Sequence, residues 1–397
     1  MSFPSSPSFP SSPSFGLFAQ DASASHPLSS YGWDDDWAAV FAPHARQGLL
    51  PGRVVRVDRG QCDVVTPHGT VRADTAFVVP RDPMRIVCTG DWVAVDPDGD
   101  PQFVRTLLPR RTAFVRSTSS QRSEGQVLAT NVDHIAICVS LAVDLDLGRV
   151  ERFLALAMSS TDGDALLGDG ERATDGTAEP IVVLTKADLV PDAATLSYLV
   201  QDIEAVAPGV QVLPVSSTTG EGLDVFAAIV SGGTSVLLGA SGAGKSTLAN
   251  TLLGRDVMEV QAARDVDGKG RHTTTTRNLL VLPTGGVLID TPGLRGVGLW
   301  DAESGVGQVF SEIDELAGRC RFHDCAHLTE PGCAVLVAIE DGSLSERRLD
   351  SYRKLLRENR RIVAKTDARL RSELLREWKR KGAEGRAAMD AKRGRMR

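Results

Sequence analysis

The stretch Gly239–Thr247 (GASGAGKST) constrains the fold of this chain more than any other feature. It has the spacing G-x-x-x-x-G-K-[ST] of a phosphate-binding loop, follows the apolar run Val236–Leu238, and leads into a helical pattern from Thr247 to Leu253. Small residues let consecutive backbone N–H groups surround a phosphate at a helix N-terminus. Lys245 adds a positive charge for the terminal phosphates, and the Ser246 hydroxyl is a ligand for Mg²⁺. The pattern therefore predicts a site for a Mg²⁺–nucleoside triphosphate, formed by Gly239, Ala240, Ser241, Gly242, Ala243, Gly244, Lys245, Ser246 and Thr247.

The residues around this loop indicate an α/β domain over residues 117–299. Apolar runs alternate with helical stretches, which implies a mostly parallel sheet covered on both faces. Nucleotide is then expected at the carboxyl ends of the strands. The expected strands are Val132–Leu141, Ile181–Leu184, Val210–Val215, Ser235–Leu238, Leu279–Leu282 and Val287–Ile289. Residues 163–179 are polar and rich in glycine, and we interpret them as a mobile surface insertion.

Two further motifs identify the nucleotide as GTP. Thr185-Lys186-Ala187-Asp188 ends a predicted strand and resembles the guanine-recognition motif N-K-x-D, with Thr185 in place of the usual Asn. Asp188 would accept hydrogen bonds from N1–H and the amino group of guanine, which adenine does not offer. Ser216 and Ser217 follow the next strand and fit the loop whose backbone contacts guanine O6, although two serines alone are a weak signal.

The segment Asp290-Thr291-Pro292-Gly293 supplies the remaining phosphate contacts. It follows the predicted strand Val287–Ile289 in the arrangement D-x-x-G, in which the Asp reaches Mg²⁺ through water and the Gly N–H meets the γ-phosphate. In Ras-like GTPases the phosphate loop comes first and the base-recognition loops come last, whereas here the order is reversed. The sequence therefore indicates a circularly permuted GTPase domain, which a site built from converging strand ends tolerates.

A polar loop, Gly268–Thr276, lies where switch I is expected. Thr273 or Thr274 would close onto Mg²⁺ there, and we assign Thr273 to the metal and Thr274 to catalysis. Leu294 stands where a Ras-like enzyme places the Gln that orients water, so slow intrinsic turnover is expected. His272 is our candidate for orienting the water, with a solvent-exposed loop histidine as the alternative.

The residues before this domain divide into two parts. Residues 1–47 begin with Ser/Pro-rich repeats, and we predict a disordered leader, with Trp33–Phe41 as a short helix that docks elsewhere. Residues 48–112 contain short alternating strands, which favour an OB-fold barrel. Arg53, Arg56 and Arg59 could line an RNA-binding rim, although a purely structural barrel fits the composition equally well.

A cluster of metal-ligand residues follows the GTPase domain. Cys320-x4-Cys325-x-His327-x5-Cys333 offers three thiolates and one imidazole, the ligand set of a closed structural zinc site. His323 is an alternative ligand. We therefore expect a zinc-binding domain over residues 300–344.

Residues 345–397 form a basic tail. The chain as a whole carries a net charge of −7, whereas 19 Lys and Arg face 8 Asp and Glu from residue 344 onward. Apolar residues at helical spacing predict a helix that packs on the zinc-binding or GTPase domain near its start. The remaining arginines would meet RNA phosphates, with a solvated helix face as the alternative.

No apolar run approaches the length that spans a bilayer, and the N-terminus lacks the pattern of a secretory signal. We therefore expect a cytoplasmic monomer with reduced thiols that does not bind membranes.

Taken together, the barrel, the permuted domain with G-R-H-T-T at Gly270–Thr274 and D-T-P-G, the cysteine cluster and the basic tail resemble the RsgA (YjeQ) family. The resemblance covers residues 49–361. It implies a GTPase that docks on the small (30S) ribosomal subunit late in its assembly, contacts rRNA, and hydrolyses GTP to GDP when the subunit stimulates it. The long leader, the insertion and Thr185 depart from the family pattern.

Three alternatives stay open at this point. A permuted GTPase of the large subunit is disfavoured by the barrel and the zinc cluster. A metabolic P-loop kinase would have no use for the guanine-recognition motif. A GTP-binding switch or scaffold with little hydrolysis is favoured by Leu294 alone.

Overall fold

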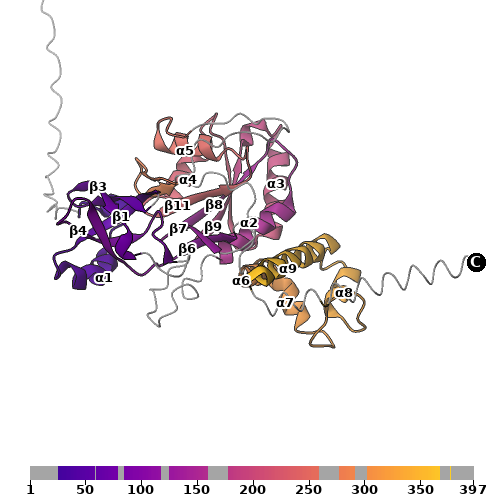
Figure 1. The fold of residues 1–397 in the computed structure, drawn as a ribbon. Coiled ribbons are helices and arrows are strands. Elements are labelled where there is room, and N and C mark those ends of the chain that lie inside the picture. Colours follow the sequence, from indigo (N-terminus) through magenta and orange to yellow (C-terminus); the bar gives the residue numbers. More distant parts are fainter. Residues whose placement is uncertain are drawn as a thin grey trace, which may run out of the picture.

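The computed structural model describes residues 26–58, 60–78, 85–117, 125–159, 178–258, 277–290, 302–366 and 376. In this part of the chain a β-barrel lies at one end, a six-stranded sheet with helices on both faces lies in the centre, and a group of helices lies at the other end (Figure 1). The predicted insertion at 163–179 falls outside the described residues except for its last two.

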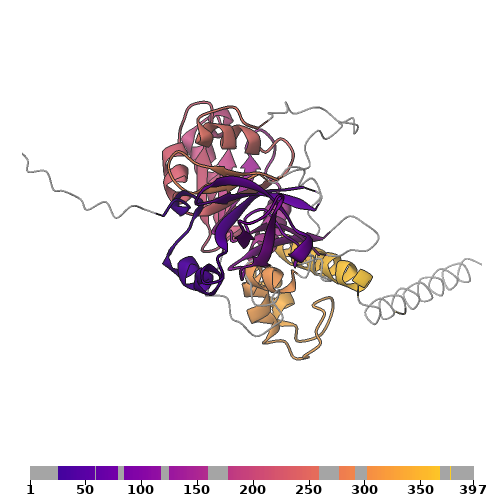
Figure 2. The ribbon, with the colours of Figure 1, turned by 60° about the vertical axis from the view of Figure 1, so that its left-hand side comes forward.

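The barrel contains five strands in the closed order β1-β2-β3-β5-β4 (Figure 2). They are β1 (Leu50–Asp58), β2 (Gln61–Thr66), β3 (Gly69–Asp74), β4 (Trp92–Asp96) and β5 (Gln102–Leu107), with the 3₁₀ turn η2 (Ala76–Val78) between β3 and β4. Val93 and Val95 point inward with Val54, Val64 and Val104, because alternate strand residues face the same side. The predicted OB-type barrel is confirmed.

The segment before the barrel is folded. After the turn η1 (Ser29–Tyr31), helix α1 (Asp35–Ala45) begins at the N-cap Asp34, whose carboxylate accepts the N–H of Trp37 at 2.7 Å. Trp37 and Phe41 pack against Trp92 on the outer face of the barrel. The prediction of a disordered leader is therefore wrong for residues 26–47, and the expectation of a short docking helix is correct.

The central sheet has the order β10-β9-β8-β11-β13-β12 and is parallel except for the β12–β13 pair. Its strands are β8 (His134–Ser140), β9 (Glu179–Thr185), β10 (Gln211–Val215), β11 (Thr234–Gly239), β12 (Leu279–Val281) and β13 (Val287–Ile289). Helices α2 (Leu147–Ser159) and α3 (Ala193–Val206) cover one face. Helices α4 (Leu223–Ile229) and α5 (Lys245–Leu253) cover the other.

A hairpin of β6 (Ala113–Ser117) and β7 (Gly125–Thr130) connects the barrel to this sheet and was not predicted from the sequence. The junction also buries charge. The Arg53 side chain, only 1% exposed, lies over the Trp92 ring at 4.8 Å and donates to Thr234 Oγ1 at 3.0 Å. The expectation that Arg53 lines an RNA-binding rim is therefore wrong; Arg56 is exposed, and Arg59 lies outside the described residues.

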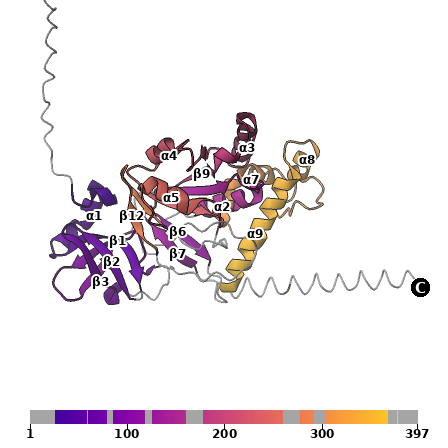
Figure 3. The same ribbon diagram turned by 90° about the horizontal axis from the view of Figure 1, so that it is seen from above.

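In residues 302–366, which the structure describes, four helices follow the sheet: α6 (Glu303–Val309), α7 (Ser311–Ala317), α8 (Ala334–Glu340) and α9 (Glu346–Thr366). Helix α9 lies against α2 and α6, with Leu349 and Leu355 in the shared core (Figure 3). The expected packing of the first part of the tail is confirmed. Across the described ranges, no helix has the length and apolar character needed to cross a membrane.

Candidate functional site

The phosphate-binding loop connects β11 to α5, as its sequence context predicts. Gly244 is the N-cap of α5 and has a φ of 80°, a left-handed conformation that glycine adopts without strain. The Lys245 ammonium donates to Gly239 O at 2.9 Å and to Ala240 O at 2.7 Å. Burial lowers its pKa. A part-buried ammonium that donates to two carbonyls in the described structure is well placed to exchange them for the oxygens of a phosphate.

The loop after β9 packs directly on the phosphate-binding loop. Thr185 Oγ1 donates to Ala243 O at 2.8 Å, and Lys186 Nζ donates to Gly242 O at 3.1 Å. Lys186 itself adopts a φ of 61°. The hydroxyl of Thr185 therefore ties the base-recognition loop to the phosphate loop, a role that the sequence did not reveal for this departure from Asn.

Asp188 lies beside the loop that follows β10. The Ser216 hydroxyl donates to Asp188 Oδ1 at 2.6 Å, and Ser216 Oγ lies 3.2 Å from Thr218 N and 3.1 Å from Thr219 N. Ser216 is fully buried and Ser217 is half-buried. The structure thus brings the two predicted base-recognition loops together and orients one oxygen of the Asp188 carboxylate.

Asp290 follows β13 at the same edge of the sheet, and its N–H donates to Asn278 O at 2.9 Å. Burial raises the pKa of its carboxyl to about 6, although attraction to Lys245 opposes this shift. A carboxylate that is destabilised by burial gains from a nearby cation such as Mg²⁺. The predicted residues His272, Thr273, Thr274 and Gly293 lie outside the described residues.

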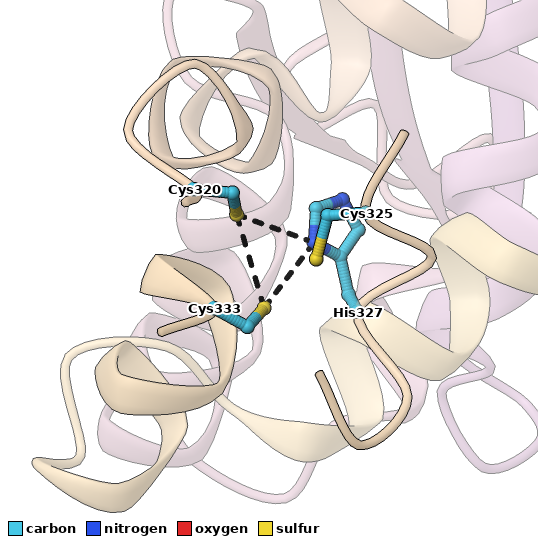
Figure 4. A group of neighbouring side chains, drawn as sticks. All are labelled: Cys320, Cys325, His327 and Cys333. Atoms are coloured by element: carbon cyan, nitrogen blue, oxygen red, sulfur yellow. Dashed lines mark hydrogen bonds between the residues drawn. The ribbon is translucent and has the colours of Figure 1, made fainter. Parts of the chain in front are cut away.

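The cysteine cluster brings four ligand atoms together as a zinc site requires (Figure 4). The Sγ of Cys320 lies 3.8 Å from Cys333 Sγ, and His327 Nδ1 lies 3.6 Å from Cys320 Sγ and 3.4 Å from Cys333 Sγ. All four ligand atoms, including Cys325 Sγ, lie within 4.8 Å of one another. Ligand bonds of about 2.3 Å to sulfur and 2.0 Å to nitrogen place tetrahedral ligand atoms about 3.5–3.8 Å apart. The four residues therefore fit zinc.

Neighbouring groups shape the loop that carries two of these ligands. The Glu330 carboxylate accepts the N–H groups of Ala326, Leu328 and Thr329 at 3.2, 2.7 and 3.0 Å. Arg353 of α9 donates to His327 O. These two supports were not predicted, although an acidic residue inside a tight ligand loop is a signal for such a turn. His327, the ligand predicted from the sequence, lies in the cluster. The alternative, His323, is exposed and is not part of it.

Comparison with known proteins places this arrangement in a family. Residues 172–300 match the family model described as RsgA GTPase. Over 373 residues, 94% of this chain and 96% of the relative, the sequence is 74% identical to the small ribosomal subunit biogenesis GTPase RsgA of Streptomyces avermitilis. The chain belongs to the RsgA family. It is a GTPase of that family, as its motifs predict.

Two solved structures share the fold of this RsgA-family chain. YjeQ from Thermotoga maritima is 24% identical with a TM-score of 0.53, and the match covers 78% of this chain and 98% of that one. YloQ, described as a circularly permuted GTPase, is 21% identical with a TM-score of 0.52, and the match covers 78% of this chain and 95% of that one. The predicted permuted architecture is therefore confirmed.

Proposed function

We propose that this chain hydrolyses GTP in the biogenesis of the small ribosomal subunit, where it binds the subunit through its rRNA. Its 74% identity to a GTPase named for that process, over nearly the whole of both chains, is the observation that carries the proposal. The convergence of the phosphate loop, the base-recognition loops and Asp290 supports it at the level of the site.

The phosphate loop would hold the β- and γ-phosphates. The backbone N–H groups of Gly242 to Ser246 would surround the phosphates at the N-terminus of α5, and Lys245 would transfer its hydrogen bonds from Gly239 O and Ala240 O to phosphate oxygens. Its ammonium then stabilises the negative charge that moves toward the leaving group in the transition state.

Ser246 and Asp290 fit the requirements of a magnesium site. Ser246 would contribute its hydroxyl and Asp290 its carboxylate through water, while Thr273 would join from switch I and the Gly293 N–H would meet the γ-phosphate. Mg²⁺, when bound with GTP, neutralises phosphate charge. The pKa of about 6 for Asp290 indicates a carboxylate that a cation would stabilise in its charged form.

Guanine selectivity would come from Asp188. The Ser216 hydroxyl occupies one oxygen of this carboxylate, which leaves the second oxygen to accept from the base. Backbone groups at Ser216 and Ser217 would contact guanine O6. Thr185 and Lys186 hold the loop against the phosphate site, and Ala187 is buried next to them. Adenine has neither the N1–H nor the 2-amino group that guanine would donate to Asp188, so ATP would bind far more weakly than GTP.

Water activation needs a residue outside this set, because Leu294 offers no polar group. We assign this role to His272 in switch I, with Thr274 as a neighbouring catalytic group. His272→Ala is expected to bind GTP as wild type does and to lose subunit-stimulated hydrolysis in a phosphate-release assay. Stimulation at the wild-type level would refute the assignment.

RNA contact would involve the exposed cations of α9. Arg347 and Arg348 pair with Glu151, and Arg353 donates to His327 O, so we do not assign these three arginines to RNA. The other exposed cations of the described helix are Lys354, Arg357, Arg360 and Arg361, of which Arg357 donates to Arg353 O within the same helix. Because phosphate contacts release counterions, binding should weaken steeply with salt. We further infer that the protein acts as a monomer in the cytoplasm, where the subunits are assembled.

Cosedimentation tests the proposal. Purified small subunits are expected to retain the protein with a non-hydrolysable GTP analogue, to release it with GDP, and to lose it as salt rises. Retention on large subunits alone, or equal retention with GTP analogue and GDP, would contradict the proposed function.

A further inference from the structure

After Asp290, the next residue that the structure describes is Ala302, and helix α9 forms a hydrogen bond to it. Ala302, fully buried, donates its N–H to Asn359 Oδ1 of α9 at 3.1 Å. Asn359 is itself only 2% exposed. Ala302 is the N-cap of α6, and its own side chain caps nothing. A buried helix terminus without a partner is costly, so this bond fixes where α6 begins.

The opposite end of α6 is held by the same helix. Arg348 donates to Val309 O in the last turn of α6 and lies over the Phe310 ring at 4.2 Å. Its other donors reach Glu151 Oε1 of α2 at 2.8 Å and Glu312 Oε1 of α7 at 2.7 Å. Two residues three turns apart on α9 therefore secure both ends of α6.

Helix α6 also has little freedom against α2. Gly305 packs so closely that an added Cβ would lie 2.0 Å from Ala155 O. A contact this close leaves α6 little room to adjust. Because Ala302 is also bonded to Asn359, a displacement of α9 would strain the start of α6, twelve residues after Asp290 in the sequence.

We propose that Asn359 is a positioning residue for GTP hydrolysis, which couples the tail helix, through Ala302, to the nucleotide site that contains Asp290. The inference rests on the proposed function and specifies how subunit binding reaches the nucleotide. The exposed cations Arg357, Arg360 and Arg361 lie within one turn of Asn359 along α9. RNA phosphates that bind them would bias the position of the helix at the point where it holds Ala302.

The test compares four full-length proteins: wild type, Asn359→Ala, Asn359→Asp and Leu355→Ala. Asn359→Asp keeps the acceptor oxygen and places negative charge at the N-terminus of α6, where it is favourable. Leu355 is buried in the same helix, and its side chain belongs to the core rather than to the bond at Ala302. It is the matched control for loss of stability without loss of that bond.

For Asn359→Ala we expect the kcat of small-subunit-stimulated hydrolysis to fall about fivefold, because one hydrogen bond to a buried N–H is lost. The half-saturating subunit concentration and the GTP affinity should stay within about twofold of wild type. Asn359→Asp should recover most of the kcat. Leu355→Ala should lower the Tm at least as much as Asn359→Ala does, but it should keep most of the wild-type kcat.

Wild-type kcat in Asn359→Ala would overturn the inference, as would an equal loss in Leu355→Ala or no recovery in Asn359→Asp. If Asn359→Ala does not fold, Asn359→Ser takes its place, because the serine hydroxyl is too short to reach Ala302. If wild type itself is not stimulated, the proposed function fails. The kcat without subunits is then compared among the four proteins. Equal rates in wild type and Asn359→Ala would overturn the inference.

Discussion

The Asp290 carboxyl is largely buried beside the phosphate loop, and among the described residues Lys245 offers it a compensating charge. Its native pKa of about 6 exceeds the ordinary value of 3.8. The native state therefore binds this proton more tightly than the unfolded state does. The stability that Asp290 contributes is complete below the unfolded pKa and is lost as the pH rises from about 4 toward 6. The site thus holds a destabilised charge until a cation arrives.

Asn at position 290 should remove this penalty in the nucleotide-free protein. A shift of about two pKa units corresponds to about 3 kcal/mol, so Asp290→Asn should raise the free energy of unfolding by up to that amount at pH 7.5. The gain should shrink to about half at pH 5, where wild-type Asp290 is largely protonated. Urea unfolding at both pH values measures it. A variant less stable than wild type at pH 7.5, or a gain that does not change with pH, would contradict this interpretation of the site.

Individual residues mark how far sequence reasoning reached at this scale. The motif predicted the place of Thr185, but its bond to Ala243 O depends on two loops 58 residues apart. Arg53 was misassigned because an arginine in a strand is usually exposed, whereas here the central sheet at Thr234 and the Trp92 ring bury it. Local spacing thus identifies ligand-binding residues, whereas burial by distant segments is not encoded in any short window.

At the scale of elements, the close approach of helix α6 to α2 depends on one glycine. The missing Cβ of Gly305 lets α6 approach the backbone of α2 at Ala155 and Ser159. Gly307 lies in the same helix, but a Cβ there would meet only the Asp314 carboxylate at 2.9 Å. These two glycines lie two residues apart in one helix but have different neighbours in space.

Replacing each glycine by Ala separates packing from helix propensity. Gly305→Ala should destabilise the protein by about 1–3 kcal/mol, because the new methyl group meets backbone atoms that cannot rotate away. Gly307→Ala should be neutral or stabilise by up to about 1 kcal/mol, because Ala favours helix and the Asp314 side chain can move. Thermal unfolding compares them, and equal shifts in Tm would show that the α2–α6 contact does not decide stability.

Metal content tests the zinc loop between α7 and α8. We expect about one zinc ion per chain in wild type and in His323→Ala, and much less in Cys325→Ser. Removing zinc with a chelator should lower the Tm and expose residues 320–333 to protease, because this short loop depends on its ligands for closure. Zinc loss in His323→Ala, or full zinc content in Cys325→Ser, would mean that the ligand set is wrong.

The sequence predicted elements well where periodicity was strong. The six strands of the central sheet follow from apolar runs, and the barrel follows from alternation. The β6–β7 hairpin was missed because its strand Ala113–Ser117 directly follows the barrel and resembles a linker. Helix α1 was underestimated because its burial depends on Trp92, more than fifty residues later.

At the scale of the molecule, the tail helix joins parts that sequence reasoning treated separately. The basic composition of α9 suggested a helix for RNA, yet Arg347 and Arg348 form ion pairs with the fully buried Glu151 of α2. Arg353 supports the zinc loop, and Glu358 pairs with Arg152 of α2. Only part of the positive charge therefore faces solvent. Helix α9, which we propose to face RNA, also supports the zinc loop and α6, and this arrangement would link subunit binding to the nucleotide site.

The most direct test of this view is GTP hydrolysis by the full chain alone, with small subunits and with large subunits, using ATP as the nucleotide control. We predict slow turnover alone, stimulation by small subunits only, and no comparable hydrolysis of ATP. Turnover that neither subunit changes would contradict a role in small-subunit biogenesis, and would leave a zinc-binding, circularly permuted GTPase whose stimulus lies elsewhere.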